Sequence, residues 1–331
     1  MSAADMKAAD PPVRVPPAAP GGRPAKGTSD PRRARRRGAL LPYLLIAPAF
    51  VAIVAVFAWP LVKTVMMSFQ DVGRRELWTG DAAPWVGFDQ FSTILGDGEF
   101  WDSVVRTVLF MVVCVVVTMG AGLLLAQSMQ RMTRWIRLAL TGALVAAWSM
   151  PLLVASSVFR WFSDSDYGVA NMVLTKYLGL HFRGHNWWLD PKQGFVVIGA
   201  LVIWGAVPFV VITLYAALTQ VPAELEEAAA LDGAGTFGIF RYVTWPVIKP
   251  VFQMVCTLSV IWDFNVFGQV FLLRDNKPEP DYNLLGLYSF DKAFESNSFS
   301  EGAAISLITV LLLSGVAVYY LRQLLKIGEV E

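Results

Sequence analysis

The chain has 331 residues, of which 55% are hydrophobic and only 16% are charged. Because a soluble globular domain normally carries about 25% charged residues, this composition indicates a membrane protein. The formal net charge is +1, and the two cysteines, Cys114 and Cys256, both lie in apolar runs. A disulfide framework and a CxxC metal site are therefore excluded.

Residues 1–38 are rich in Pro, Gly, Ala and Arg and end in PRRARRR. Such a composition cannot form a core, so we expect a disordered basic tail. An arginine run can be a nucleic-acid patch. Positive charge beside a membrane helix is, however, typical of the cytoplasmic end of that helix, which is the interpretation favoured here.

Six apolar runs follow, each long enough to cross a bilayer as a helix of about 20 residues. They are residues 43–66, 104–126, 138–159, 195–218, 247–267 and 302–324. The first run is too long for a signal peptide and lacks a small-residue cleavage site, so we expect an uncleaved helix. The predicted fold is an all-α polytopic membrane domain over residues 39–331.

Two of these runs contain residues that predict a break in the helix. Ser149 comes just before Pro151 in the third run, and Trp204 and Gly205 come just before Pro208 in the fourth. Proline removes a helical hydrogen bond and clashes with the preceding turn. We therefore expect an interruption in each of these two helices.

The distribution of Lys and Arg predicts the orientation in the membrane. The basic tail places the N-terminus in the cytoplasm, and six crossings return the C-terminus there. The short loop 127–137 agrees, because it is cytoplasmic in this topology and carries Arg131, Arg134 and Arg137. The long loops, rich in aromatic residues, then lie outside: 67–103, 160–194 and 268–301. His181 and His185 lie in one of them without acidic or thiol neighbours, so no metal site is expected.

The cytoplasmic stretch EEAAALDGAG, residues 226–235, is polar and helix-forming between two apolar runs. Pro222 suits a first helical turn, acidic residues follow it, and Gly233 is a natural stop. We expect a short helix over 222–232. Thr236 should cap a second short helix that reaches Tyr242, and Pro246 should open the next membrane helix.

This segment has the properties of a docking site for a soluble partner. Leu225, Ala228 and Ala229 lie on one helical face, where small side chains permit a close approach. An amphipathic helix on the lipid surface is the alternative, but such helices favour Lys and Arg, and this one begins with glutamates. The glycines of residues 233–238 spell GxGxxG, yet they follow a helix and lack the βαβ context of a dinucleotide site.

The same stretch resembles the EAA motif of permease subunits of ATP-binding-cassette importers. That motif is E-A-A, three residues, Gly, nine residues, then I-x-L-P. The chain has Glu227-Ala228-Ala229, Gly233 and, at the expected spacing, Val243-Thr244-Trp245-Pro246. The stretches WVGFDQFSTIL, GVANMVLTKYLGL and DFNVFGQVFLLRDNKPEPDYNLLGLYSFDKAF also resemble carbohydrate-importer permeases of the maltose- and glycerol-phosphate-type family.

The resemblance implies a six-helix type I importer permease that imports a sugar or oligosaccharide. Its partners would be a second permease, a dimer of ATPase subunits and an extracellular sugar-binding protein, all acting at the cell membrane. Glu227 would pair with a basic residue of the ATPase, and Gly233 would permit the turn. The implied coupling residues are Glu227, Ala228, Ala229, Gly233 and Pro246.

Nothing in the sequence predicts catalysis by the chain itself. It has no G-x-x-x-x-G-K-[ST] phosphate loop and no nucleophile–base constellation. We therefore expect no cofactor in this chain, with ATP and Mg²⁺ bound by the partner ATPase, and no metal site.

Polar residues inside membrane spans tend to face a bundle interior or a substrate path. Carbohydrates need hydrogen-bonding groups beside aromatic faces, and the later spans contain both. The candidates for the path are Asn265, Asp263, Phe264, Gln269, Ser149 and Trp204. Structural packing of these residues stays open as an alternative. An ion-coupled secondary transporter is the alternative function, with Asp263 as its main ionisable group within the spans.

Overall fold

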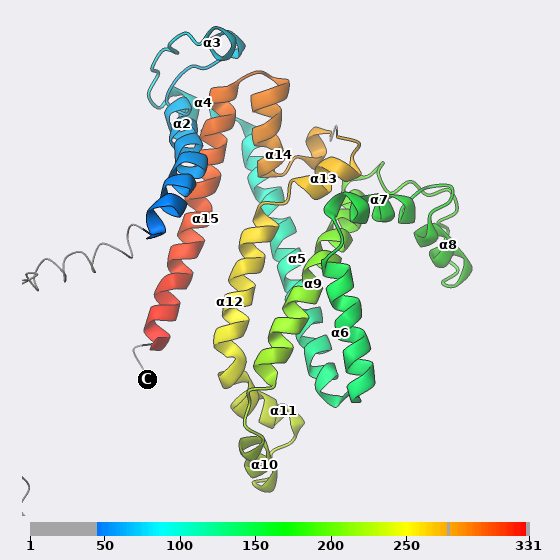
Figure 1. Cartoon of the computed structure of the whole chain (residues 1–331). Helices are drawn as coiled ribbons and strands as arrows, with labels where there is room; N and C mark the ends of the chain where they lie inside the picture. Colours follow the sequence, from blue (N-terminus) through cyan, green and yellow to red (C-terminus); the bar gives the residue numbers. More distant parts are fainter. Residues whose placement is uncertain (1–44, 277–278, 329–331) are drawn as a thin grey trace, which may run out of the picture. The chain divides into compact units, whose positions relative to one another are not determined.

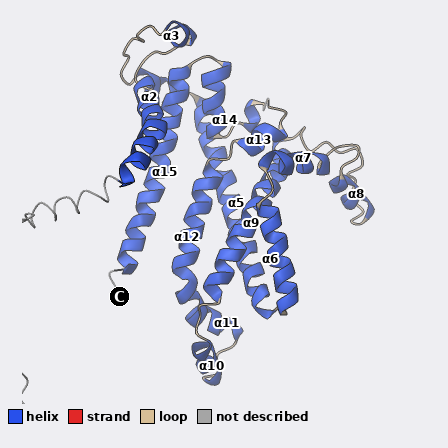
Figure 2. Ribbon diagram, in the orientation of Figure 1, coloured by secondary structure: helices blue, strands red, loops and turns tan. Residues whose placement is uncertain are grey.

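The computed structural model describes residues 45–276 and 279–328, and these residues are almost entirely helical (Figures 1 and 2). Their sole β-pairing is an isolated antiparallel bridge between Gln70 and Trp85. The predicted all-α class is confirmed. The predicted tail, residues 1–38, lies outside the described residues.

The chain divides into two compact units, residues 1–59 and 60–331. The described part of the first unit is helical and includes a π-helical turn, η1 (Val54–Ala58). The helix continues through the boundary as α2 (Trp59–Met67), so that Leu45–Met67 is one apolar helical segment of 23 residues. Its bounds agree closely with the expected first span.

Across the described residues, five helical segments are long and apolar enough to cross a membrane. Besides Leu45–Met67, they are α5 (Gly98–Arg131), α9 (Pro191–Leu218), the segment Thr236–Phe264, and the apolar part Phe299–Tyr319 of α15 (Phe299–Gly328). The segment Thr236–Phe264 consists of α11 (Thr236–Ile239), the π-helical η2 (Phe240–Thr244) and α12 (Trp245–Phe264).

The third expected span is not one straight helix. It consists of α6 (Arg134–Trp148) and α7 (Leu152–Phe162), which meet at a bend of 99°. The break falls at the predicted position, because Pro151 cannot donate a helical hydrogen bond. At 1.5 Å per residue, the 15 residues of α6 extend only about 22 Å, short of a bilayer core of about 30 Å. Counted as one broken span, the pair gives a sixth crossing.

The second predicted break is wrong. Gly205 and Pro208 lie inside α9, which runs without interruption through 28 residues. Pro208 is buried, and α9 packs against α5, α6, α7 and α12. Neighbouring helices hold a membrane helix straight through a proline, although Pro208 still leaves the carbonyl of Trp204 without its usual helical donor.

The centre of the larger unit is the pair α5 and α9. Helix α9 is apolar on every side and contributes to the core along its whole length, including Ile198, Leu201, Val210 and Leu214. Gly122 of α5 lies directly against Val210: a β-carbon at Gly122 would come within 2.4 Å of the Val210 Cγ1 atom. The two helices approach closely because position 122 carries no side chain.

Short helices occupy the connections. Those at the upper end of α9 and α12 in Figure 1 include α13 (Gly268–Leu273) and α14 (Leu285–Phe290), whereas α10 (Ala223–Leu231) lies at the lower end. We call these the α14 end and the α10 end. The remaining short elements are α3 (Arg74–Thr79), α4 (Asp89–Leu95), α8 (Val169–Lys176), η3 (Pro280–Tyr282) and η4 (Asp291–Glu295).

The contact between α5 and α9 leads to a stability test. Gly122→Val should lower the melting temperature of the purified protein, since overpacking a tight contact costs about 1–3 kcal/mol. Gly120→Val is the matched control on the same helix, because nothing lies within 4 Å of a β-carbon at Gly120. Equal melting temperatures for the two variants in detergent would contradict the close packing of α5 on α9.

Candidate functional site

A cavity of about 280 Å³ lies among α6, α7, α9, α12 and the start of α13. Its lining is apolar except for a few groups and is rich in tryptophan. The lining residues are Ala147, Trp148, Met150, Leu152, Ala155, Leu201, Val202, Trp204, Gly205, Ala206, Trp262, Asp263, Val266 and Gln269.

The cavity is built at two helix breaks. The first is the bend between α6 and α7, where Trp148, Met150 and Leu152 contribute to the wall. The second is the gap between the end of α12 at Phe264 and the start of α13 at Gly268, where Asp263, Val266 and Gln269 contribute. Helices α7 and α13 pack against each other. Two interruptions that are far apart in the sequence therefore line the same cavity.

Three indole rings form the aromatic part of the wall. The ring of Phe209 supports two of them, with its centroid 5.9 Å from that of Trp148 and 5.3 Å from that of Trp262. The third, Trp204, packs against Phe159 at 5.7 Å. Each indole is thus fixed by a second aromatic ring while it borders the cavity. Flat apolar faces beside polar groups can bind the carbon–hydrogen faces of sugar rings.

Asp263 is the acidic group of the cavity wall. Its residue is 3% exposed, and its Oδ2 atom makes no hydrogen bond within the described part of the chain. Burial of a carboxylate without a partner is costly, and such groups in membrane proteins tend to be functional. Gln269, half-buried on α13, adds an amide to the same wall.

The structure brings together three of the six predicted path residues, namely Asp263, Gln269 and Trp204. Ser149 falls between two lining residues, but its hydroxyl donates to the carbonyl of Ala146 at 2.9 Å. Asn265 is exposed at the end of α12, and Phe264 is buried in a different cluster. Sequence reasoning singled out none of Val202, Ala206 and Val266, which are small or apolar and carry no signal for a site.

The segment expected to dock a partner lies at the α10 end. Helix α10 runs from Ala223 to Leu231, with Pro222 as its N-cap, close to the predicted 222–232. Gly233 has φ +85°, which L-residues rarely adopt. The Gly233 amide donates to the carbonyl of Ala230, and the Ala234 amide donates to that of Ala229. This Schellman arrangement satisfies the last carbonyls and stops the helix where the sequence predicted.

The second predicted helix in this segment is wrong in extent. Thr236 makes no capping hydrogen bond, and Gly235 is the N-cap. The helix does not stop at Tyr242 but continues through η2 into α12. As predicted, Pro246 lies in the first turn of α12, although the helical segment extends back through η2 to Thr236. A proline in a first turn needs no amide donor, and a π-helical turn absorbs the irregularity just before it.

One side-chain hydrogen bond ties α10 to the membrane helix. The hydroxyl of Thr244 donates to Glu226 at 2.9 Å, and Thr244 is buried. This role of Glu226 was not predicted, because the sequence does not show which glutamate faces inward. Glu227 and Ala228 are exposed and Ala229 is half-buried. Large apolar side chains are exposed beside them, with Leu231 90% and Phe237 79% exposed.

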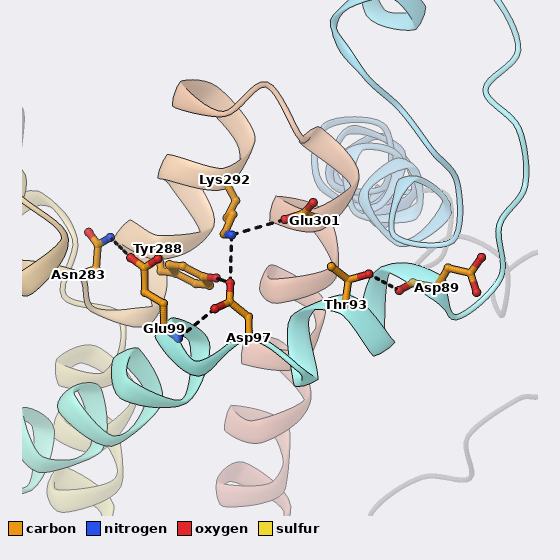
Figure 3. Close-up of polar contacts among 8 residues, drawn as sticks. All are labelled: Asp89, Thr93, Asp97, Glu99, Asn283, Tyr288, Lys292 and Glu301. Carbon is orange, nitrogen blue, oxygen red and sulfur yellow. Dashed lines mark hydrogen bonds and ion pairs between the residues drawn. The ribbon is translucent and has the colours of Figure 1, made fainter.

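A polar cluster fixes the α14 end (Figure 3). Asp97 caps α5 by accepting from the Glu99 amide at 3.0 Å. Its other oxygen accepts from the Tyr288 hydroxyl at 2.5 Å and from Lys292 at 3.1 Å. Lys292 also lies 3.8 Å from Glu301 of α15. This cluster, which the sequence analysis did not identify, joins α5, α14, η4 and α15.

The cluster shifts the pKa values of its members. The hydrogen bond from Tyr288, with those from Lys292 and the Glu99 amide, holds the pKa of Asp97 below its ordinary value despite the opposing effect of burial. Burial and the bond to Asp97 raise the pKa of Tyr288. Burial alone would lower the pKa of Lys292, but Tyr288 and Asp97 outweigh it and raise that pKa. The cluster therefore favours an ionised Asp97 and a charged Lys292.

Further hydrogen bonds attach the loop before α14 to α5. Arg106 donates to the carbonyls of Pro280 and Asn283, at 3.1 and 2.7 Å. The Leu285 amide donates to the hydroxyl of Thr107 at 2.8 Å. Asn283 and Leu285 are buried, so these bonds satisfy backbone groups that would otherwise lack partners there. At the α14 end, the loop before α14 is therefore attached to α5 by several hydrogen bonds.

Comparison with known proteins identifies the family. Residues 118–326 match the family described as binding-protein-dependent transport system inner membrane component, and the chain belongs to this family. The chain is 40% identical to the diacetylchitobiose uptake system permease protein of Streptomyces coelicolor, over 92% of this chain and 93% of that protein. It is 29% identical to the sulfoquinovosyl glycerol transport system permease protein of Agrobacterium fabrum, over 86% and 90%.

The fold is that of a solved importer. A chain of the bacterial ABC transporter involved in the import of the acidic polysaccharide alginate superposes with a TM-score of 0.75 at 17% identity, covering 89% of this chain and 98% of that one. The predicted importer permease fold is confirmed. The protein is accordingly a multi-pass permease of the inner-membrane transport family.

The pKa shift of Asp97 leads to a prediction about acid stability. A carboxyl whose folded pKa is lowered stabilises the fold above its unfolded value, near 3.8, and loses that contribution as the pH falls through the folded pKa. Asp97→Asn should therefore lower the melting temperature most above pH 5, and the gap from wild type should narrow toward pH 3. Asp102→Asn, which alters an exposed carboxylate on the same helix, is the control. A gap that stays constant with pH would contradict the role of the ionised Asp97.

Proposed function

We propose that this permease forms half of the translocation path of an ATP-driven importer that takes up a sugar or oligosaccharide. The cavity at the two helix breaks is the observation that carries the proposal, because it places three indole rings beside a carboxyl and an amide. Membership of the transport family and 40% identity to a permease named for diacetylchitobiose uptake support the same substrate class.

The proposal includes partners that the chain needs in order to work. An extracellular binding protein would deliver the sugar, a second permease would complete the path, and a dimer of ATPase subunits would bind ATP and Mg²⁺. This chain would catalyse no reaction itself. Both termini and α10 would face the cytoplasm, as the basic tail and the arginines of the 127–137 loop predict.

Helix α10 is suited to receive the ATPase. Glu227 and Ala228 are exposed, so a basic and closely fitting surface could contact them. Leu231 and Phe237 add exposed apolar area of the kind found at protein interfaces. The glutamate that faces inward, Glu226, is occupied by Thr244 and would not be available to the partner.

The path from α10 to the cavity is a continuous helix. Thr244 connects α10 to the segment Thr236–Phe264, whose far end carries Trp262 and Asp263 in the cavity wall. A rigid displacement of α10 would therefore move one wall of the cavity against α6 and α9. This geometry fits rigid-body switching between two states, driven by closure of the ATPases.

Copurification tests the proposal. The protein, tagged and extracted in mild detergent, should copurify with a second permease and an ATPase, and the assembly should show ATPase activity stimulated by one sugar-loaded binding protein. In reconstituted vesicles, uptake should persist with an ionophore present while ATP is supplied. Uptake that collapses with the ionophore at constant ATP would instead favour the ion-coupled alternative.

Truncation of a cavity tryptophan should weaken transport. We expect Trp204→Ala to lower the initial uptake rate at limiting sugar by about tenfold, the effect of losing about 1.4 kcal/mol of interaction. Trp161→Ala, at an exposed position outside the cavity, is the control and should leave uptake near the wild-type rate. Equal rates for the two variants would show that the cavity does not contact the sugar.

The turn after α10 should be specific for glycine at position 233. Gly233→Val forces a β-branched residue into a left-handed conformation at a cost of about 1–2 kcal/mol, which should displace α10 and reduce copurification of the ATPase. Gly235→Val is the control, because Gly235 has φ −71° and ψ 169°, which any residue adopts. Normal sugar-stimulated ATPase activity in an assembled Gly233→Val variant would contradict the coupling role of this turn.

A further inference from the structure

Among the described residues, the cavity wall contains an acidic residue but no basic residue. Of its lining residues, Asp263 is the only ionisable one, and the described wall contains no Lys, Arg or His. Two arginines of the adjoining helices have other partners: Arg137 donates to the Tyr215 hydroxyl at 2.7 Å, and Arg160 pairs with Asp275. The remaining polar lining side chains, the indoles and Gln269, carry no charge.

Asp263 is held in the wall without an internal partner. It is almost fully buried, and Oδ2 receives no hydrogen bond from the described residues. A buried polar atom without a partner in a native structure calls for a partner supplied by water or ligand. Ligand hydroxyl groups are suitable partners for the Asp263 carboxyl, because each donates one hydrogen and a carboxyl oxygen accepts it.

We infer that Asp263 determines the charge specificity of the path, so that the cavity accepts uncharged, hydroxyl-rich saccharides and rejects saccharides that carry a carboxylate, sulfonate or sulfate. This inference rests on the proposed function. Three indole faces hold the sugar rings, and Asp263 accepts hydrogen bonds from their hydroxyls.

The rejection of anionic saccharides follows from the cost of burying charge. An anionic group on the ligand enters the cavity without meeting a cation, and an isolated buried anion is strongly disfavoured. The carboxyl of Asp263 supplies no positive charge to compensate that anion, and no other described lining residue does so. A neutral saccharide of the same shape avoids the cost of burying a charge without a counterion. Specificity therefore arises as much from the penalty on the wrong ligand as from contacts with the right one.

The test measures binding to the permease assembly without its binding protein, so that selection by that protein does not enter. The assembly is purified in lipid nanodiscs and titrated by ligand-observed NMR. The probes are diacetylchitobiose, maltose and cellobiose, each paired with the same disaccharide in which one primary alcohol has been oxidised to a carboxylate. The quantity compared is the ratio of the two dissociation constants within a pair.

For the wild type, at least one neutral disaccharide should bind about tenfold or more tightly than its carboxylated counterpart. Asp263→Asn has nearly the same shape, and it should weaken the neutral probe and reduce that ratio about tenfold, equivalent to 1.4 kcal/mol. Asp263→Glu should retain the ratio, because it keeps a carboxyl group, whereas the Asn amide can donate a hydrogen bond to an anionic probe. Asp281→Asn, an exposed carboxylate outside the cavity, should change neither value.

Three results would overturn the inference while the proposed function stands, each in an assembly whose ATPase still responds to a sugar-loaded binding protein. They are equal binding within every pair by the wild type, an unchanged ratio in Asp263→Asn, or no binding of any probe. If instead no sugar-loaded binding protein stimulates the assembly, the proposed function fails and the inference fails with it.

Discussion

A lipid bilayer offers no hydrogen bonds to a peptide backbone, so a helix that stops inside it must stop against protein or a polar cavity. Among the described helices, α6 ends at Trp148, too short to cross alone, and α12 ends at Phe264. Both stops contribute residues to one cavity, and α9 crosses uninterrupted beside them. The cavity therefore lies where two of its bordering helices end.

The helix that ends at the cavity is also the one that begins next to α10. Because Thr236–Phe264 is helical throughout, its two ends cannot move independently without bending the π-helical turn at η2. The hydrogen bond between Thr244 and Glu226 lies within this turn, where α10 is attached. At the α14 end, by contrast, Asp97, Tyr288 and Lys292 clamp α5 to α14. The α10 end is therefore suited to transmit a displacement of α10 to α12, whereas the α14 end is suited to resist movement of α5 against α14.

Local features of this fold were predictable from sequence, whereas features set by distant contacts were not. The membrane spans follow from hydropathy, the break after α6 from the missing amide of Pro151, and the end of α10 from the left-handed turn at Gly233. Each of these causes lies in neighbouring residues of the sequence. Pro208 carries the same local signal as Pro151, yet α9 stays continuous because helices surround it. Asp97 and Tyr288 are hydrogen-bonded although they are 191 residues apart in the sequence, and the residues around either one do not predict the other.

The contrast between Asp263 and Asn265 shows where sequence reasoning about a membrane site reaches its limit. Both are polar, they are two residues apart, and either could face a path if the helix continued. Because α12 ends at Phe264, Asp263 keeps its helical position in the cavity wall, while Asn265 leaves the helical register and is exposed. The end of α12 therefore decides that the cavity wall includes Asp263 and not Asn265. The same change in backbone direction that borders the cavity also selects which polar side chain of this segment lines it.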